Sequence, residues 1–316
     1  MKKEAYRALD LFAGVGGIKL GFEKAGFKTV FANDFEEKCK PTYDLNSSSI
    51  KLNTEDINKL NINELPEFDI LLGGFPCQSF SIAGYRKGFK DKGRGDLFFK
   101  IYDIISEKRP EVVFLENVKN LENHDKGRTF KIIFDTLEML GYKIKHKVLN
   151  SMMHGNIPQN RERIFIIGFL DHKKADLFNF PEEVILTKSF KDFLEKEIPD
   201  KYYYLGKPLH DKIKKEIISK DKVYQWRRKY VRENKKGVVP TLTANMGMGG
   251  HNVPIIRDEK GIRKLTPKEC FNLQGFPENF KLPNLADSVL YKQAGNSVTV
   301  KVIEKIAKNI KIALNS

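Results

Sequence analysis

The first half of the chain alternates short apolar runs with amphipathic stretches of helical period, the pattern of successive βαβ units. The apolar runs predict buried strands over residues 7–12, 29–32, 69–72, 112–115, 145–149 and 164–169. Residues 97–108 and 130–140 carry apolar side chains on one helical face, so we expect helices there. Parallel strands joined by helices form a doubly wound sheet, and we therefore predict an α/β, mostly parallel, Rossmann-like fold.

The second half of the chain breaks this rhythm. Helical signals are weak from residue 171 to about residue 284, where proline, glycine, lysine and aromatic residues interleave. This stretch predicts a second, smaller, irregular and mostly β domain. Residues 298–314 have an apolar stripe opposite a row of lysines, so we expect an amphipathic helix that packs back on the first domain.

Charge narrows the class of partner. The 316 residues include 56 lysines and arginines against 41 acidic residues, a net charge of +15. Residues 181–264 hold 20 basic and 12 acidic side chains, so a net +8, about half of the excess, lies there. A basic excess suits a polyanion such as nucleic acid, and the competing interpretation is a lysine-rich composition without functional meaning.

Several protein classes are disfavoured. No apolar run is long enough to span a membrane, and no signal-peptide pattern is present, so we expect neither a membrane protein nor export. The three cysteines lie far apart, which argues against a disulfide framework and a cysteine-rich zinc site and fits a reducing cytoplasm. None of the six histidines has metal-ligand spacing, so no metal is expected.

Ligands of an open parallel sheet bind beyond the carboxyl ends of its strands. A glycine-rich turn containing Gly14 and Gly16 follows the first predicted strand, and Asp34 follows the second, about 20 residues after Gly14. An acid at that position accepts hydrogen bonds from ribose hydroxyls, so a nucleoside-containing cofactor is favoured over a purely structural turn. Asp56 gives a weaker signal for contact with an adenine amino group.

Further strand ends carry reactive side chains. Cys77 lies in a loop after two glycines, which favours a nucleophilic thiolate over a small buried hydrophobe. Glu116 can hold or protonate a ring nitrogen, or serve as a helix cap or surface acid. Gln159, Arg161 and Arg163 alternate along the chain, so we expect them to share one face and to clamp a carbonyl oxygen or phosphates.

Together these motifs resemble those of the cytosine-C5 DNA methyltransferase family, in family order and over nearly the whole chain. The matching segments are residues 10–17, 74–78, 116–118, 159–163, 263–270 with 274–277, and 295–298. The resemblance implies a Rossmann-like fold of the kind that uses S-adenosylmethionine, with a smaller recognition domain. It also implies a division into a catalytic and cofactor-binding domain at 1–178, a target-recognition domain at 179–284, and a segment at 285–316 that returns to the first domain.

The resemblance assigns roles to individual residues. Cys77 is expected to add to C6 of cytosine, Glu116 to hold and protonate N3, and Arg163 to bind O2 with the support of Arg161. S-adenosylmethionine is the implied cofactor and S-adenosylhomocysteine the product. The implied cofactor-binding residues are Phe12, Gly14, Gly16, Asp34, Asp56, Ile57, Pro76, Leu97, Asn296 and Ser297.

A base inside a duplex must be flipped out before it can be methylated. Residues 79–96, rich in glycine, lysine, arginine and serine, resemble the family's mobile loop, which closes over the flipped base. The residues expected to contact DNA are Gln78, Ser81, Arg227, Arg228 and Thr241.

The expected function is therefore C5 methylation of cytosine in a short specific duplex sequence, by the methylase of a prokaryotic restriction-modification system. We expect a cytoplasmic, nucleoid-associated monomer with double-stranded DNA as partner and no membrane or metal, whose cognate restriction endonuclease shares the site without binding the enzyme. The first alternative is a tRNA cytosine methyltransferase on the same scaffold, disfavoured because that branch usually carries Pro-Pro-Cys-Gln. A non-catalytic DNA-binding module and a cysteine hydrolase are the remaining alternatives.

Overall fold

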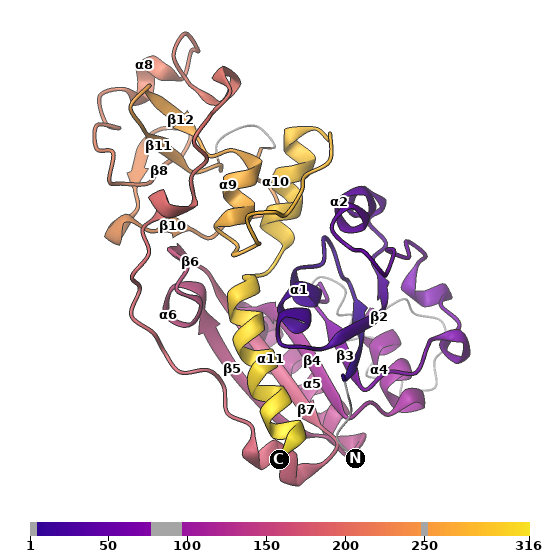
Figure 1. The fold of residues 1–316 in the computed structure, drawn as a ribbon. Helices are drawn as coiled ribbons and strands as arrows, with labels where there is room; N and C mark the ends of the chain where they lie inside the picture. The colour runs from indigo at the N-terminus through magenta and orange to yellow at the C-terminus, as the bar shows by residue number, and fades with distance from the viewer. Residues whose placement is uncertain (1–4, 77–96, 248–251) are drawn as a thin grey trace. The chain divides into compact units, whose positions relative to one another are not determined.

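The computed structural model describes residues 5–76, 97–247 and 252–316, except for the side chain of Lys236. The chain divides into two compact units, which are described separately (Figure 1). The first unit comprises Met1–Leu149, Glu162–Glu182 and Ile303–Ser316, and the second comprises Asn150–Arg161 and Glu183–Val302.

A six-stranded sheet forms the centre of the first unit, in the order β2-β1-β3-β4-β7-β5. Neighbouring strands pair in parallel from β2 to β4, and β7 pairs antiparallel with β4. The strands are β1 (Arg7–Leu11), β2 (Lys28–Asn33), β3 (Ile70–Gly73), β4 (Val112–Val118), β5 (Lys143–Asn150) and β7 (Glu162–Phe169). The predicted mostly parallel α/β sheet is confirmed, with strands close to the predicted ranges.

Helices cover both faces of this sheet because both faces are apolar. On one face Leu9, Leu71 and Val113 pack with Ile101 of α4 and Ile133 of α5. On the other face, the ring of Phe22 in α1 meets Phe114 of β4 at 5.0 Å between centroids. The α-helices of this part are α1 (Gly17–Lys24), α2 (Lys40–Leu45), α4 (Leu97–Lys108), α5 (Arg128–Met139) and α7 (His172–Leu177).

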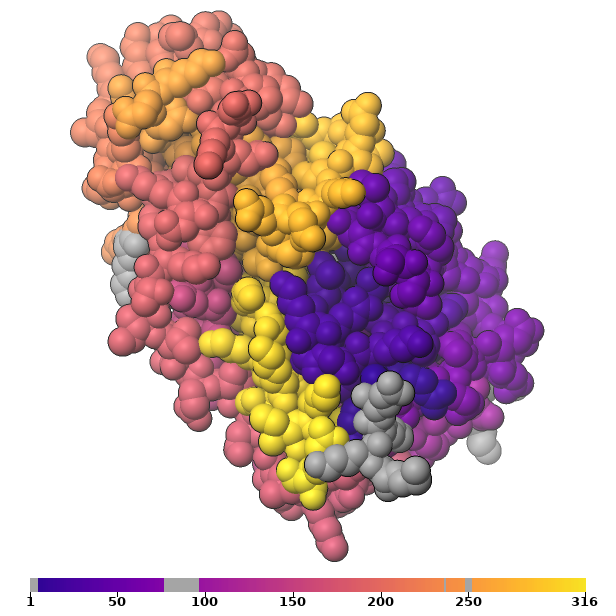
Figure 2. Space-filling view, in the orientation of Figure 1, coloured from indigo at the N-terminus to yellow at the C-terminus, as the bar shows by residue number. Residues whose placement is uncertain are grey.

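The C-terminal helix α11 (Val300–Asn315) runs into the first unit. The Tyr6 hydroxyl donates to the carbonyl of Leu314 at 3.2 Å, and Lys311 Nζ donates to the carbonyl of Ala25 at 3.1 Å. Gly21 allows α1 to approach this helix, since a Cβ there would lie 2.5 Å from Ile303 Cγ2. Residues 303–316 therefore lie against the N-terminal segments of the chain (Figure 2).

The second unit contains a four-stranded antiparallel sheet in the order β12-β11-β8-β9 and a short parallel pair, β10 with β6. Its strands are β6 (Gln159–Asn160), β8 (Tyr224–Trp226), β9 (Val231–Glu233), β10 (Val239–Pro240), β11 (Ile255–Arg257) and β12 (Ile262–Lys264). Its helices are α6 (Ser151–Gly155), α8 (His210–Ile213), α9 (Pro267–Asn272) and α10 (Asp287–Asn296). The expectation of a second, smaller β domain is confirmed, and its main sheet is antiparallel.

Short 3₁₀ helices join these elements at η1 (Glu37–Cys39), η2 (Ile57–Lys59), η3 (Ile62–Glu64), η5 (Lys119–Gly127), η6 (Phe190–Phe193), η7 (Asp200–Tyr202) and η8 (Lys235–Gly237). No helix among the described residues is both long and apolar enough to cross a membrane.

The boundaries of the two compact units differ from the predicted domain boundaries at residues 178 and 284. Residues 150–161 belong to the second unit because β6 pairs with β10 and because the hydroxyls of Ser151 and Thr299 are 2.6 Å apart. Residues 285–302 also belong to it. The division by function into catalytic, recognition and returning segments stays a prediction.

Candidate active site

The turn after β1 holds a carboxylate at the carboxyl ends of two neighbouring parallel strands. Asp34, directly after β2, accepts hydrogen bonds from the backbone N–H of Gly14 at 2.7 Å and of Glu36 at 2.8 Å. Gly14 and Gly16 both have positive φ, +54° and +86°, which a residue with a Cβ rarely adopts. The predicted pairing of the glycine turn with Asp34 is thus present in the structure.

Two phenylalanines belong to the segments that meet at this carboxylate, Phe12 just after β1 and Phe35 just after Asp34. Phe12 has φ +55°, a conformation that costs energy for a bulky residue and is found mainly at functional sites. Phe35 is 72% exposed, directly beside Asp34, which leaves its ring available for stacking on a ligand. The sequence reasoning missed Phe35, although an aromatic residue next to the acid was a usable signal.

Asp56 begins a short 3₁₀ helix next to the end of β2. Its Oδ1 accepts a hydrogen bond from the backbone N–H of Asn58 at 3.0 Å, so the carboxylate also caps η2. Asn33 Nδ2 donates to the carbonyl of Glu55 at 2.8 Å, which ties this segment to the last residue of β2. Ile57 is buried. The contact of Asp56 with adenine stays a prediction.

Glu116 and Arg163 form an ion pair on the neighbouring strands β4 and β7. Arg163 Nε lies 3.1 Å from Glu116 Oε1, and the two side chains are 17% and 10% exposed. Antiparallel pairing sets this contact, because Glu116 faces Phe165 and Val118 faces Arg163 in the ladder. The two predicted partners of a cytosine ring therefore lie together in the first unit.

The segment that leads to Cys77 is anchored beside this pair. Asn117 Nδ2 donates to the carbonyl of Phe75 at 2.9 Å, and both residues are buried. Gly74 lies close to the acid, since a Cβ there would be 3.6 Å from Glu116 Oε2. Pro76 is exposed. Cys77, Gln78, Ser81 and the predicted loop 79–96 lie outside the described residues.

Asp10, in the first motif, is completely buried. Burial raises the pKa of its carboxyl to about 8, and the charge of Asp34 adds to this, while Lys19 opposes it. The Lys19 ammonium itself lies 3.3 Å from Glu23. The sequence did not predict a role for Asp10, because one acid in an apolar strand does not show whether its side chain will be buried.

The first part of the 159–163 motif organises the second unit. Arg161 is buried, and its Nη1 donates to the carbonyl of Leu242 at 2.7 Å, while its Nη2 donates to the carbonyls of Gly295 and Ser297. The Thr241 hydroxyl donates to the carbonyl of Asn160 at 2.6 Å. These bonds join the 159–163 and 295–298 motifs to residues 241–242. A shared face of Arg161 with Arg163, and its support of catalysis, stay predictions.

The remaining predicted residues have less defined surroundings. Leu97 is half-buried at the start of α4, Asn296 is exposed, and Ser297 is buried. Arg228 occupies a tight turn with φ +66° at the tip of the β8–β9 hairpin. Arg227 and Thr241 line a cleft of about 680 Å³ in the second unit.

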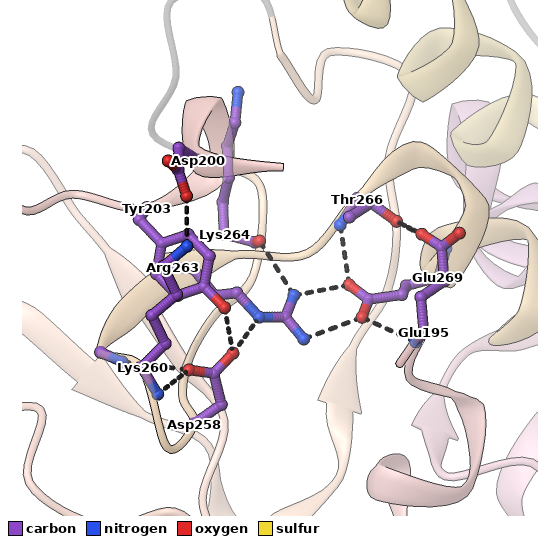
Figure 3. A network of polar contacts seen from close by, with 10 residues as sticks. Glu195, Asp200, Tyr203, Asp258, Lys260, Arg263, Lys264, Thr266 and Glu269 are labelled. Carbon is purple, nitrogen blue, oxygen red and sulfur yellow. Dashed lines mark hydrogen bonds and ion pairs between the residues drawn. The ribbon is translucent and has the colours of Figure 1, made fainter. Parts of the chain in front are cut away.

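A buried polar network supports the motif at residues 263–270 (Figure 3). The Arg263 guanidinium donates to both oxygens of Glu269 at 2.8 Å and to Asp258 at 2.6 Å. Glu269 also accepts from the backbone N–H of Thr266 at 2.8 Å, which completes the cap of α9. Arg263 and Glu269 are almost fully buried. Each charge is therefore compensated where water cannot reach it.

Comparisons with known proteins agree with this set of motifs. The family model of the C-5 cytosine-specific DNA methylases matches residues 6–312. The chain is 55% identical over 306 residues to the type II methyltransferase M.Bsp6I of Bacillus sp. (strain RFL6), covering 95% of this chain and 97% of that protein. It is 41% identical over 320 residues to the type II methyltransferase M.HaeII of Haemophilus aegyptius, covering 98% and 94%.

Solved structures show the same fold at low sequence identity. The methyltransferase EhMeth of Entamoeba histolytica aligns with a TM-score of 0.78 at 20% identity, over 99% of this chain and 100% of that one. The Dnmt2 methyltransferase of S. pombe aligns with a TM-score of 0.75 at 21% identity, over 98% and 100%. Because the family model spans nearly the whole chain and the type II relatives match it end to end, the protein belongs to the C-5 cytosine-specific DNA methylases and is a DNA (cytosine-5-)-methyltransferase.

Proposed function

We propose that the enzyme methylates C5 of a cytosine flipped out of duplex DNA, through a covalent adduct between Cys77 and C6 of the ring. The observation that carries this proposal is the Glu116–Arg163 pair beside the anchored segment that leads to Cys77. A carboxyl and a guanidinium at that place match the ring nitrogen and the carbonyl oxygen of cytosine.

The chemistry requires activation, because C5 of cytosine is a weak nucleophile. The Cys77 thiolate adds to C6, and Glu116 protonates N3, so the ring becomes an enamine that is nucleophilic at C5. S-adenosylmethionine supplies the methyl group as an electrophile and leaves as S-adenosylhomocysteine. A base then removes the C5 proton, and the electron pair of that C–H bond restores the ring double bond as the Cys77 thiolate departs from C6. N3 returns its proton to Glu116, which leaves neutral 5-methylcytosine.

Glu116 and Arg163 hold each other in place before the cytosine binds. In the absence of DNA each compensates the other's charge, so neither is buried alone. An entering cytosine replaces their direct contact. Its O2 accepts a hydrogen bond from the Arg163 guanidinium, and the Glu116 carboxylate, released from the ion pair, takes up a proton from water and donates it to N3. Within the second unit, Arg161 fixes the backbone of residues 295–297 by donating to the carbonyls of Gly295 and Ser297. Its support of Arg163 is part of the proposal.

The first unit fits S-adenosylmethionine. A Cβ at Gly14 would meet no atom nearer than Asp34 Oδ2 at 4.0 Å, so the backbone of this turn is open to a ligand there, whereas Gly16 lies against the ring of Tyr43. The Asp34 carboxylate is fixed where ribose hydroxyls can donate to it. Phe35, next to Asp34, offers an exposed ring for the adenine. The remaining proposed cofactor residues are Phe12, Asp56, Ile57, Pro76, Leu97, Asn296 and Ser297.

Double-stranded DNA is the proposed substrate, and residues 79–96 are proposed to close over the flipped base. Gln78, Ser81, Arg227, Arg228 and Thr241 are the proposed DNA contacts. The relatives are named type II methyltransferases, which supports a role as the modification enzyme of a restriction-modification system, with a cognate endonuclease that recognises the same site. We further propose a monomer that acts in the cytoplasm at the nucleoid.

Methyl transfer from labelled S-adenosylmethionine to duplex DNA and to tRNA tests the function. We expect label in duplex DNA, recovered as 5-methylcytosine after digestion, and none in tRNA. The Cys77→Ser protein should bind DNA and cofactor but transfer no methyl group. Label in tRNA alone, or an active Cys77→Ser protein, would contradict the proposal.

A further inference from the structure

The β8–β9 hairpin of the second unit has one apolar and one polar face. Its register pairs Gln225 with Arg232 and Trp226 with Val231. Tyr224, Trp226 and Val231 pack in the apolar cluster of this unit. Because side chains alternate along a strand, Gln225 and Arg232 point to the opposite side. The hairpin is therefore fixed to the apolar cluster by one face, and its polar side chains lie on the other face.

That polar face lines the cleft of about 680 Å³, which includes Gln225, Arg227 and Arg232. Gln225 is only 5% exposed, and its Oε1 accepts a hydrogen bond from Arg227 Nη2 at 3.2 Å. An amide held inside the protein fixes the direction of the guanidinium that it binds. The cleft thus contains an arginine whose planar fork is oriented before any ligand enters.

The loop at the hairpin tip offers charge of a different kind. Arg228 and Lys229 are exposed, as Arg227 is, but neither is among the residues that line the cleft. Exposed, unoriented cations suit phosphates, which require charge but no planar geometry. The buried Gln225 partner of Arg227 would add nothing to a phosphate contact, whereas recognition of a base edge requires a fixed plane.

We propose that Arg227, positioned by Gln225, reads one guanine through the major groove and so sets one position of the recognised sequence. This inference rests on the proposed methylation of duplex DNA. A two-stranded β-ribbon fits the major groove, and the arginine fork matches O6 and N7 of guanine with two parallel hydrogen bonds. Gln225 is a positioning residue in this arrangement.

The test uses the full-length enzyme on a library of DNA duplexes in which the base pairs around a central cytosine are randomised. Sequencing that detects 5-methylcytosine gives the preference at each position. For Arg227→Ala we expect the preference for guanine at one position to fall by about 10- to 100-fold, with the other positions unchanged. Arg227→Lys should lose most of it as well, because an ammonium cannot form the paired contact.

Two further comparisons distinguish recognition of guanine by Arg227 from a general effect of charge and from a loss of folding. Lys229→Ala removes the same charge from the same loop, so it should weaken methylation of all sequences alike and leave the preferences intact. Gln225→Glu keeps the acceptor for Arg227 and should retain the guanine preference, whereas Gln225→Leu should lose it. Cofactor affinity, measured by calorimetry, should match the wild type in each variant.

Three outcomes overturn the assignment to Arg227. They are a preference profile of Arg227→Ala equal to that of the wild type, a relaxed position that is not guanine, and the same positional loss in Lys229→Ala. A different result marks failure of the proposed function itself: wild-type enzyme would then leave every duplex of the library without 5-methylcytosine, and the inference would fall with it.

Discussion

The Glu116–Arg163 pair is the contact on which the proposed chemistry turns at the scale of single residues. Arg163→Ala should lower the single-turnover methylation rate by about 100-fold or more, because a donor to the charge that develops on O2 is lost. Arg163→Lys should restore part of it, since charge returns without the geometry of the fork. Cofactor affinity should not change in either protein. An equal loss in affinity and rate would point to a disrupted fold.

Phe35 allows a second test at this scale. Its ring is 72% exposed, so removing it should leave stability within about 0.5 kcal/mol of the wild type. If the ring stacks on adenine, Phe35→Ala should weaken S-adenosylmethionine binding by about tenfold in calorimetry, and Phe35→Trp should restore it. Met139→Ala, which truncates another side chain exposed in the same unit (66%), serves as the control and should bind normally. Equal affinity of the Phe35→Ala and control proteins would exclude the stack.

At the scale of elements, apolar periodicity located the central sheet and its helices well. Helix α4 has the predicted bounds of 97–108, because its apolar stripe ends just before Pro110, which cannot continue a helix. Strand β4 runs three residues past its predicted end, through the Glu-Asn-Val motif, since β7 pairs with it along that length. Periodicity could not reveal that residues 150–161 join the second unit, because that depends on pairing with a strand about 80 residues away.

Some residues of the candidate site could likewise be predicted from the sequence, and others could not. Motif residues such as Asp34 and Glu116 were identified from their positions after strands, and their bonds to backbone and to Arg163 follow from the parallel and antiparallel ladders. Phe35 could have been predicted from its place next to Asp34, although its exposure could not. Gln225 could not be predicted as a positioning residue, because its burial and its bond to Arg227 are properties of the folded chain.

The buried ion pair of Arg263 and Glu269 links β12 to α9, and its contribution to stability can be measured. Glu269→Ala leaves Asp258 as the acid that pairs with the Arg263 guanidinium and removes the side-chain half of the capping box of α9, so we expect a loss of about 3–5 kcal/mol in the stability of the second unit. Hydrogen exchange in β12 and α9 measures it. The exposed pair Lys131–Asp135, broken by Lys131→Ala, should change the stability of the first unit by less than about 0.5 kcal/mol. A Glu269→Ala effect as small as that would contradict the buried role.

At the scale of the whole molecule, Asp10 links the stability of the first unit to pH. Burial raises the pKa of its carboxyl from 3.8 to about 8. Between these values the unfolded chain has released this proton while the folded chain retains it, so the folded state binds more protons. The Asp10 carboxyl therefore makes the first unit less stable as pH rises from about 4 to about 8. The unfolding equilibrium constant rises by at most about tenfold per pH unit, and the effect levels off above about pH 8.

Asp10→Asn removes this linkage, because an amide does not ionise. The difference in unfolding free energy between Asp10→Asn and the wild type should grow in favour of the variant as pH rises from 5 to 8, measured by hydrogen exchange of the central sheet without cofactor. Asp135→Asn, which changes an acid paired at the surface, should run parallel to the wild type over the same range. Parallel curves for Asp10→Asn would instead show that Asp10 ionises normally in the folded protein, and that Lys19 compensates its burial.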